Sequence, residues 1–281
     1  MKGRPPAESL AATSESVYRV EPVRISSTGD APRRDPGEVV AEELLTIMIE
    51  DVGSFAVMCT PCDVKAFAVG FAFSEGMISS ADDVLQYTER HDPFTVAMRL
   101  DEPEQVISSR NLIVTSSCGL CGSRNIDNLL AGTVTCKDTL RMSVPDLCRI
   151  AREMHKQQDL FERTGGAHAA AIFSADGEII SFAEDIGRHN ALDKVIGKSL
   201  AAGQSLEQRG VMLSGRVSLE LVAKTARAGI EVLAAISAPS SLAMRAAQRC
   251  NITLCCFVRG DRTTVYTHPH RISDMDGFSI T

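Results

Sequence analysis

Residues 211–258 read VMLSGRVSLELVAKTARAGIEVLAAISAPSSLAMRAAQRCNITLCCFV, and this stretch decides the fold. Its short apolar runs at Val211 to Ser214, Val232 to Ile236 and Ile252 to Val258 predict three strands. The segments between them, Leu219 to Ala228 and Ser240 to Cys250, predict helices. Short apolar strands that alternate with helices are typical of a sheet covered on both faces. The stretch therefore predicts an α/β layer with a partly parallel sheet.

The segments before this stretch extend the same layer. Ala169 to Phe173 and Glu178 to Phe182 flank the turn Ser174-Ala175-Asp176-Gly177 and predict a hairpin. A helix is expected over about Asn190 to Ala201, and Pro145 suits the first turn of another helix. We therefore predict one α/β domain over residues 137–281.

The first half of the chain predicts a smaller α+β lobe over residues 21–136. Leu44 to Ile49, Phe55 to Met58 and Phe94 to Leu100 have the apolar character of strands. Asp63 is placed to cap a helix whose apolar side chains follow it. The predicted architecture is thus α/β, with a small N-terminal lobe beside a larger C-terminal layer.

Composition excludes several classes of function. The chain has 281 residues, a formal net charge of −7, 5% aromatic residues and no Trp, which argues against binding of extended DNA or RNA. No apolar stretch approaches the length of about 18 residues expected of a membrane span. Residues 1–20 are expected to form a disordered leader without a secretory signal. We therefore expect a cytoplasmic protein, in which the nine cysteines stay reduced.

The segment Cys118-Gly119-Leu120-Cys121-Gly122, which ends the predicted N-terminal lobe, is the strongest candidate for chemistry. Glycines around two cysteines favour a flexible, exposed loop, and a sulfur nucleophile needs exposure to reach its partner. Arg124 lies nearby in the sequence and would favour the thiolate. The spacing fits a redox pair, half of a zinc site or a persulfide-carrying site, and spacing alone does not decide among them.

A second cysteine pair with the same spacing occurs at Cys59-Thr60-Pro61-Cys62. It could complete a Cys₄ zinc site with Cys118 and Cys121. Because Cys59 ends a strand-like run and free cysteine often packs as a small apolar residue, we favour a structural role. The remaining cysteines lie in helix or strand patterns and are expected in the core: Cys136, Cys148, Cys250, Cys255 and Cys256.

Charged and small polar residues gather where the predicted strands end. His168 begins one strand, and Glu184 to Asn190 combine acids, an arginine and a histidine at the start of a helix, where Asp185 could orient an imidazole. Ser214 to Ser218 and Ser237 to Ser241 follow two strands, and Phe257 to Arg262 end a third. Because α/β sheets hold phosphorylated ligands at the carboxyl ends of their strands, these segments predict a nucleotide or pyrophosphate pocket.

Several motifs together resemble the FdhD family, which comprises accessory sulfur carriers required for formate dehydrogenase. The motifs occur in a consistent order between about Glu21 and Ile272. They are the Cys118-Gly-Leu-Cys-Gly loop, Phe71-Ala-Phe-Ser-Glu-Gly-Met-Ile78, Thr164-Gly-Gly-Ala-His-Ala-Ala-Ala171, Glu184-Asp-Ile-Gly-Arg-His-Asn-Ala-Leu-Asp-Lys194 and Tyr266-Thr-His-Pro269.

The resemblance implies a sulfurtransferase that carries sulfur as a persulfide on Cys118, with Cys121 as the second cysteine of the loop. The sulfur would pass to a molybdenum or tungsten cofactor with two guanine dinucleotides, which GDP would mimic. The implied fold is similar to that of cytidine deaminases. The chain lacks their His-x-Glu and Pro-Cys-x-x-Cys zinc motifs, so we expect neither deaminase chemistry nor a metal site. The implied cofactor-binding residues are Phe257, Val258, Arg259, Gly260, Asp261 and Arg262.

The resemblance also implies partners: a cysteine desulfurase as sulfur donor, formate dehydrogenase as client, and a second copy of the chain in a homodimer. An alternative function is a zinc- or cofactor-binding chaperone of formate dehydrogenase that transfers no sulfur. The cysteine pair at Cys59 and Cys62 receives no role from the resemblance.

Overall fold

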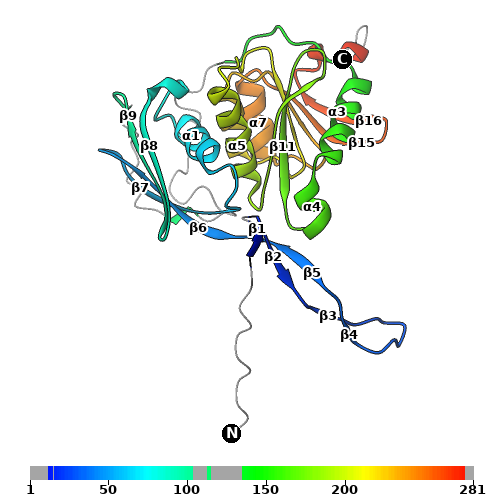
Figure 1. The fold of residues 1–281 in the computed structure, drawn as a ribbon. Coiled ribbons are helices and arrows are strands. Elements are labelled where there is room, and N and C mark those ends of the chain that lie inside the picture. Colours follow the sequence, from blue (N-terminus) through cyan, green and yellow to red (C-terminus); the bar gives the residue numbers. More distant parts are fainter. Residues whose placement is uncertain (1–11, 15, 104–112, 115–134, 276–281) are drawn as a thin grey trace.

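The computed structural model describes residues 12–14, 16–103, 113–114 and 135–275. The Cys118 to Gly122 loop therefore lies outside the described residues. Two β-sheets stand side by side, with helices between them and on the outer face of the larger sheet (Figure 1). This mixed α/β architecture agrees with the predicted fold class.

The larger sheet belongs to the second half of the chain and has the strand order β12-β11-β13-β14-β15-β16. The pairs β13–β14 and β14–β15 are parallel, and the other neighbours are antiparallel. The predicted hairpin and partly parallel sheet are confirmed, and β16 is a strand that the sequence does not predict. The strands are β11 His168–Phe173, β12 Ile179–Asp185, β13 Gly210–Leu213, β14 Val232–Ala235, β15 Thr253–Arg259 and β16 Arg262–Thr267.

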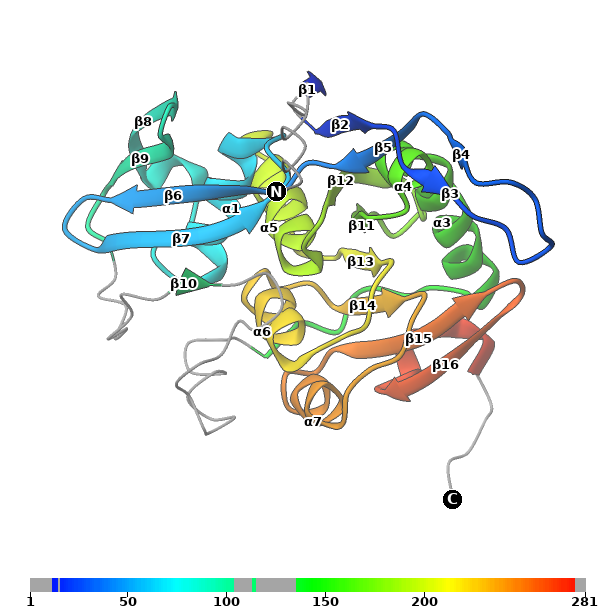
Figure 2. The ribbon, with the colours of Figure 1, turned by 90° about the horizontal axis from the view of Figure 1, so that it is seen from below.

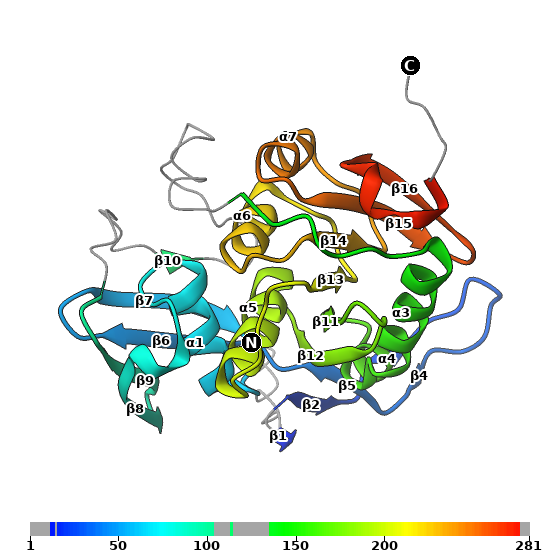
Figure 3. The same ribbon diagram turned by 90° about the horizontal axis from the view of Figure 1, so that it is seen from above.

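Helices cover both faces of this sheet (Figures 2 and 3). Alternate residues of one strand show the two faces: Val211 and Leu213 pack in the core that contains α5, α6 and α7, whereas Met212 packs in the core that contains α3. The strands are therefore buried on both sides, as their continuous apolar character predicts. The helices are α3 Val144–Lys156, α4 Asp159–Thr164, α5 Arg188–Ala201, α6 Leu219–Arg227 and α7 Ser241–Arg249.

The smaller sheet has the order β10-β7-β6-β9-β8 and is covered by α1 (Val64–Ser74). The helix starts directly after Asp63, but the predicted cap is wrong, because the Asp63 side chain makes no capping hydrogen bond. Its carboxylate instead lies 2.7 Å from Lys198 Nζ of α5. The strands are β6 Glu43–Ile49, β7 Gly53–Cys59, β8 Val84–His91, β9 Phe94–Leu100 and β10 Ile113–Val114.

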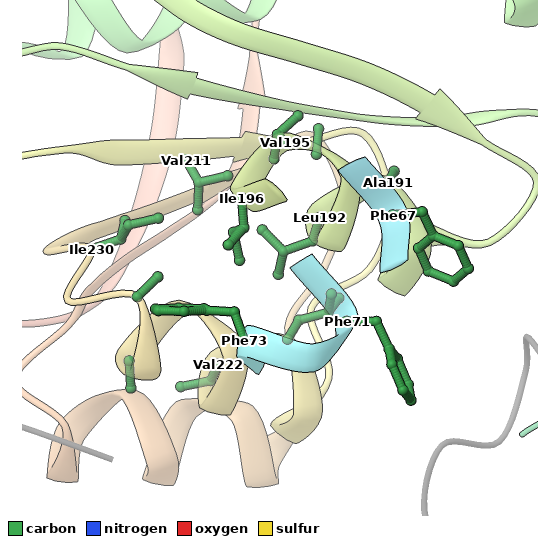
Figure 4. Close-up of a cluster of buried hydrophobic side chains, with 14 of the residues drawn as sticks. Phe67, Phe71, Phe73, Ala191, Leu192, Val195, Ile196, Val211, Val222 and Ile230 are labelled. Carbon is green, nitrogen blue, oxygen red and sulfur yellow. The ribbon is translucent and has the colours of Figure 1, made fainter. Parts of the chain in front are cut away.

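The two halves of the fold share one continuous core where α1 meets α5. Phe73 of α1 and Leu192 and Ile196 of α5 belong to the same buried cluster (Figure 4). The two helix backbones approach closely at a pair of glycines. A methyl group at Gly70 would overlap the carbonyl oxygen of Asp193, and one at Gly197 would overlap that of Ala66. Glycine at both positions therefore sets the distance between the lobes.

Short N-terminal strands pack against the larger lobe near α4 (Figure 1). Val17 is fully buried and packs with Leu160 and Ala167 of the larger lobe. A packed strand over Val17–Val20 therefore lies within the stretch for which the sequence predicts a disordered leader. Among the described residues, none of the helices combines the length and apolar character needed to cross a membrane. The remaining elements are β1 Ala12–Ser14, β2 Val17–Val20, β3 Val23–Arg24, β4 Arg33–Arg34, β5 Gly37–Val40 and the 3₁₀ turns Ala81–Asp83, Pro269–Arg271 and Ser273–Met275.

Candidate functional site

The predicted polar segments do meet at one edge of the larger sheet. Strands β13, β14 and β15 are parallel, so their carboxyl ends lie together, and the antiparallel pair β11–β12 begins and ends at the same edge. Hydrogen bonds tie the following loops together: Val217 N–H donates to Ala238 O at 3.0 Å, and Phe257 N–H donates to Ser237 O at 3.2 Å. We call this region, formed by His168, residues 185–190, 214–218, 237–240 and 257–262, the carboxyl edge.

The Phe257 to Arg262 segment comprises the end of β15, the turn at Gly260 and Asp261, and the first residue of β16, at the carboxyl edge. Phe257 is 37% exposed and has a positive φ of 55°, and Gly260 has a φ of 60°, so the backbone leaves the regular strand at both positions. The Arg259 guanidinium lies 5.9 Å from the centre of the Phe257 ring, and its Nε donates to Ile236 O at 3.0 Å. An aromatic ring and a guanidinium are thus fixed together at the rim, where the sequence predicts the nucleotide.

His168 and Arg188 lie against Gly215, between β13 and α6. A methyl group at Gly215 would come within 3.2 Å of His168 Nδ1 and 3.4 Å of Arg188 Cδ, so the glycine keeps these two side chains close together. Arg188 Nε is buried and has no hydrogen-bond partner among the residues that the structure describes. Burial lowers the pKa of His168, and the charge of Arg188 lowers it further. The arrangement favours an anionic ligand that would pair with the free guanidinium donor.

His189 joins two helices and does not form a catalytic relay. Its Nε2 lies 3.1 Å from Ser218 Oγ and 2.8 Å from Glu220 Oε2, both at the start of α6. A serine–histidine–acid relay needs the hydroxyl and the carboxylate on opposite ring nitrogens, and here the same nitrogen faces both. The imidazole therefore fastens the first turn of α5 to that of α6.

Asp185 is the centre of a buried polar network. Its carboxylate lies 2.7 Å from Lys194 Nζ, and both side chains are fully buried. It also accepts hydrogen bonds from Gly187 N–H at 2.7 Å, Asn190 Nδ2 at 2.9 Å and Thr60 N–H at 3.1 Å. The prediction that Asp185 orients an imidazole is wrong, because these four donors occupy it. It connects β12 and α5 to the end of β7.

Other acids of the Glu184–Lys194 motif are also structural. Glu184 accepts the N–H groups of Leu160 at 2.9 Å and Phe161 at 2.8 Å at the start of α4. Asp193 lies 2.8 Å from Lys224 Nζ of α6. The sequence placed this motif correctly but did not identify these partners, which are 23 to 31 positions away.

The cysteines divide into core residues and one pair beside the network. Cys136, Cys148, Cys250, Cys255 and Cys256 are buried, which confirms the prediction for them. Cys59 is fully buried at the end of β7, whereas Cys62 is half-buried and lies 3.4 Å from Lys194 Nζ. Within the described part of the chain no three His, Cys, Asp or Glu side chains gather as a metal site. The Cys₄ zinc hypothesis stays untested, because Cys118 and Cys121 lie outside it.

The described residues on either side of the predicted sulfur loop are anchored in different lobes. Val114 of β10 pairs in parallel with Val57 of β7, two residues before Cys59. Cys136 N–H donates to Cys250 O, just beyond α7, at 2.9 Å. The predicted persulfide carrier Cys118 and its neighbour Cys121 lie in sequence between these two anchors, outside the described residues.

Comparisons with known proteins agree on one family. The family model described as FdhD/NarQ matches residues 40–273. A protein of Picrophilus torridus is 38% identical over 242 residues, which cover 83% of this chain and 91% of that protein. One from Streptomyces avermitilis is 39% identical over 253 residues, with coverage of 85% and 90%. Both are named sulfur carrier protein FdhD.

A solved structure shows the same fold. It is a crystal structure described as that of a formate dehydrogenase accessory protein from Desulfotalea psychrophila, with a TM-score of 0.73 and 24% identity. The match covers 92% of this chain and 99% of that one. The family model and the two sulfur carriers cover most of the chain, and this chain therefore belongs to the FdhD/NarQ family.

Proposed function

We propose that this chain is a sulfur carrier that supports formate dehydrogenase and acts as a sulfurtransferase. Its relatives are named sulfur carrier protein FdhD, and a solved structure of the same fold is described as a formate dehydrogenase accessory protein. The sulfur would travel on Cys118, the first cysteine of the glycine-flanked loop. The named relatives support the activity, and the Cys118-Gly-Leu-Cys-Gly motif supports the residue.

The proposed transfer is a thiol exchange. The Cys118 thiolate attacks the terminal sulfur of a persulfide on a cysteine desulfurase, whose own cysteine leaves as a thiolate. Cys118 then holds the sulfur as a persulfide, which is a better nucleophile than a thiol. In the second step the Cys121 thiolate attacks Cys118 Sγ, which releases the outer sulfur to the cofactor as sulfide and leaves a Cys118–Cys121 disulfide. Cys121 is placed in sequence to release the sulfur or to protect Cys118.

The acceptor that we propose is the molybdenum or tungsten cofactor with two guanine dinucleotides, bound as substrate at the carboxyl edge. The observation that carries this assignment is the buried Arg188 Nε, which has no hydrogen-bond partner within the described part of the chain, next to His168 and the α6 start. A pyrophosphate offers the charge-assisted acceptor that this donor needs. Phe257 and Arg259 at the rim then suit a guanine base, which stacks on aromatic rings and guanidinium planes.

Several finer features belong to the same proposal. A cysteine desulfurase would be the donor, the chain would act in the cytoplasm as a homodimer, and residues 137–281 would share the layering of cytidine deaminases. The β11–β12 hairpin followed by parallel strands with helices on both faces supports the last point. Guanosine diphosphate would occupy the edge as a mimic of the cofactor.

The test compares Cys118→Ala and Cys121→Ala in a strain that lacks its native carrier. We expect Cys118→Ala to abolish formate dehydrogenase activity and to prevent the purified chain from gaining the mass of one sulfur atom after incubation with desulfurase and cysteine. Both variants should still bind guanosine diphosphate, which shows that they are folded. Full activity of the Cys118→Ala strain would refute sulfur transfer and favour the chaperone alternative. A stoichiometric zinc that is lost on Cys59→Ser would favour the zinc module.

A further inference from the structure

The pair Cys59 and Cys62 has a defined place in the fold that the sulfur-carrier role leaves unused. Cys59 is the last residue of β7, and Cys62 stands two residues before the first residue of α1. Between them the chain makes a tight turn, in which Cys62 N–H donates to Thr60 O at 2.8 Å. A Cys-x-x-Cys pair between a strand and the start of a helix is the arrangement of dithiol redox motifs.

A buried ammonium lies beside this turn. Lys194 Nζ is 2.7 Å from Asp185 Oδ2 and donates to Thr60 O at 3.0 Å. Its third proton is left for Glu184 O at 3.3 Å or Cys62 Sγ at 3.4 Å. The ammonium therefore has a proton available for a thiolate at Cys62, which would accept it more strongly than a thiol does. This is the electrostatic partner that a thiol exchange needs at the attacking sulfur.

The two thiols share one environment but differ in access. The charges of Asp185 and Lys194 act on both sulfurs, which places both beside the same ion pair. Cys59 is fully buried, whereas Cys62 is half-buried, so an external reagent reaches Cys62 first. Burial raises the pKa of each thiol. The Lys194 charge acts in the opposite direction and lowers the pKa of both.

We propose that Cys59 and Cys62 form a reversible disulfide with each other, a redox function in addition to the sulfur carriage predicted for Cys118. The oxidant is a low-molecular-weight disulfide such as oxidised glutathione. The Cys62 thiolate attacks it, forms a mixed disulfide and releases one glutathione thiol. Cys59 then loses its proton and attacks Cys62 Sγ, which releases the second glutathione thiol. The cysteine pair gives up two electrons and two protons, and these convert one glutathione disulfide into two thiols.

The disulfide would act on the part of the chain that joins the two lobes. Thr60 lies inside the Cys59–Cys62 ring, donates its N–H to Asp185 at 3.1 Å and accepts from Ile186 N–H at 3.1 Å. Arg188 follows two residues later at the start of α5. Ring closure therefore constrains the residue that holds the start of α5 and, with it, the carboxyl edge.

The experiment uses the full chain with Cys118→Ala and Cys121→Ala, so that the loop pair cannot react. The protein is treated with oxidised glutathione, unfolded, alkylated with a maleimide and digested with trypsin. The peptide over residues 35–65 contains Cys59 and Cys62 and no other cysteine. We expect this peptide to carry no maleimide when the protein has been oxidised and two maleimides when the oxidised protein has been reduced again. Cys148, which is buried in α3 and is the only cysteine of its tryptic peptide, should remain alkylated throughout and serve as the internal control.

Two single variants in the same background test the order of attack. Cys59→Ser should hold one glutathione on Cys62, because no second thiol is present to displace it. Cys62→Ser should leave Cys59 unmodified, because Cys59 is fully buried. The proposal is overturned if both cysteines of the 35–65 peptide stay open to alkylation after oxidation. It is equally overturned if the chain with both cysteines retains bound glutathione instead of closing the ring.

Discussion

The buried ion pair between Lys194 and Asp185 leads to a quantitative prediction for Lys194→Met. Both side chains are fully buried at 2.7 Å separation, and the substitution leaves the Asp185 carboxylate without its cation. Breaking a buried pair in this way costs about 3–5 kcal/mol. Asp185 keeps three other hydrogen-bond donors, from Thr60, Gly187 and Asn190, which offsets part of the loss. The loss of stability is increased because Thr60 O no longer has its lysine donor. We therefore expect a loss of about 3 kcal/mol.

The charge state supports this magnitude. Burial lowers the pKa of Lys194, but the Asp185 carboxylate raises it, and the net direction is upward, so the lysine is an ammonium at neutral pH. A loss of 3 kcal/mol is a large part of the roughly 5–15 kcal/mol that holds a typical domain folded. With a urea m-value of about 3 kcal/mol/M, the midpoint should fall by about 1 M.

The assay is urea unfolding followed by circular dichroism, with Lys156→Met as the matched control. Lys156 pairs with Glu153 at 2.8 Å on the exposed face of α3, where its side chain is 68% exposed, and we expect no measurable change. Lys194→Met combined with Asp185→Asn should be more stable than Lys194→Met alone, because the uncompensated charge is gone. A midpoint for Lys194→Met equal to that of the control would refute the reasoning. So would a double variant that is less stable than the single one.

Three further predictions concern the carboxyl edge and the lobe contact. Arg188→Gln should weaken binding of guanosine diphosphate about tenfold by calorimetry, the value of one charge-assisted hydrogen bond, while Arg141→Gln, on an exposed pair with Asp138, should leave it unchanged. Burial and then Arg188 hold the pKa of His168 below 6.5, so a bound phosphate should raise that pKa and draw in a proton. The affinity of the unchanged chain for guanosine diphosphate, divided by that of His168→Gln, should therefore fall as pH rises from about 6 to 8. The same pH dependence in both proteins would contradict this. Gly70→Ala should cost about 1–3 kcal/mol in urea unfolding, because its methyl group overlaps Asp193 O, whereas Gly37→Ala, with no atom closer than 3.9 Å, should be neutral.

The larger sheet could be predicted because its information is local. The apolar runs near Val211, Val232 and Ile252 lie between segments of helical period, and strands buried on both faces leave no other interpretation at that length. The carboxyl edge could be predicted without knowledge of the contacts between residues, since neighbouring parallel strands end at the same side of a sheet. Strand β16 was missed because Arg262 to Thr267 is polar and half-exposed, so it lacks the apolar run that marks the other strands.

The polar partners could not be predicted, because they depend on contacts between distant residues. Thr60 and Asp185 are 125 positions apart, and no local pattern indicates that one accepts a hydrogen bond from the other. The prediction that Asp63 caps a helix was wrong for a related reason. The local sequence suits a capping residue, but Lys198 of the other lobe competes for the Asp63 carboxylate. Local rules place a side chain on an element, whereas the packing of α1 on α5 decides which partner it meets.

The structure also changes which residues of the Glu184–Lys194 motif can contact a substrate. The motif looks catalytic because it gathers acids, a lysine and a histidine, yet Glu184, Asp185 and Lys194 all hold neighbouring elements in place. His189 is bound to α6. Arg188 remains, with a buried donor that lacks a partner among the described residues. We propose that a site built in this way would bind and orient an anion without acid–base catalysis, which suits the proposed transfer of sulfur from a persulfide to a metal cofactor.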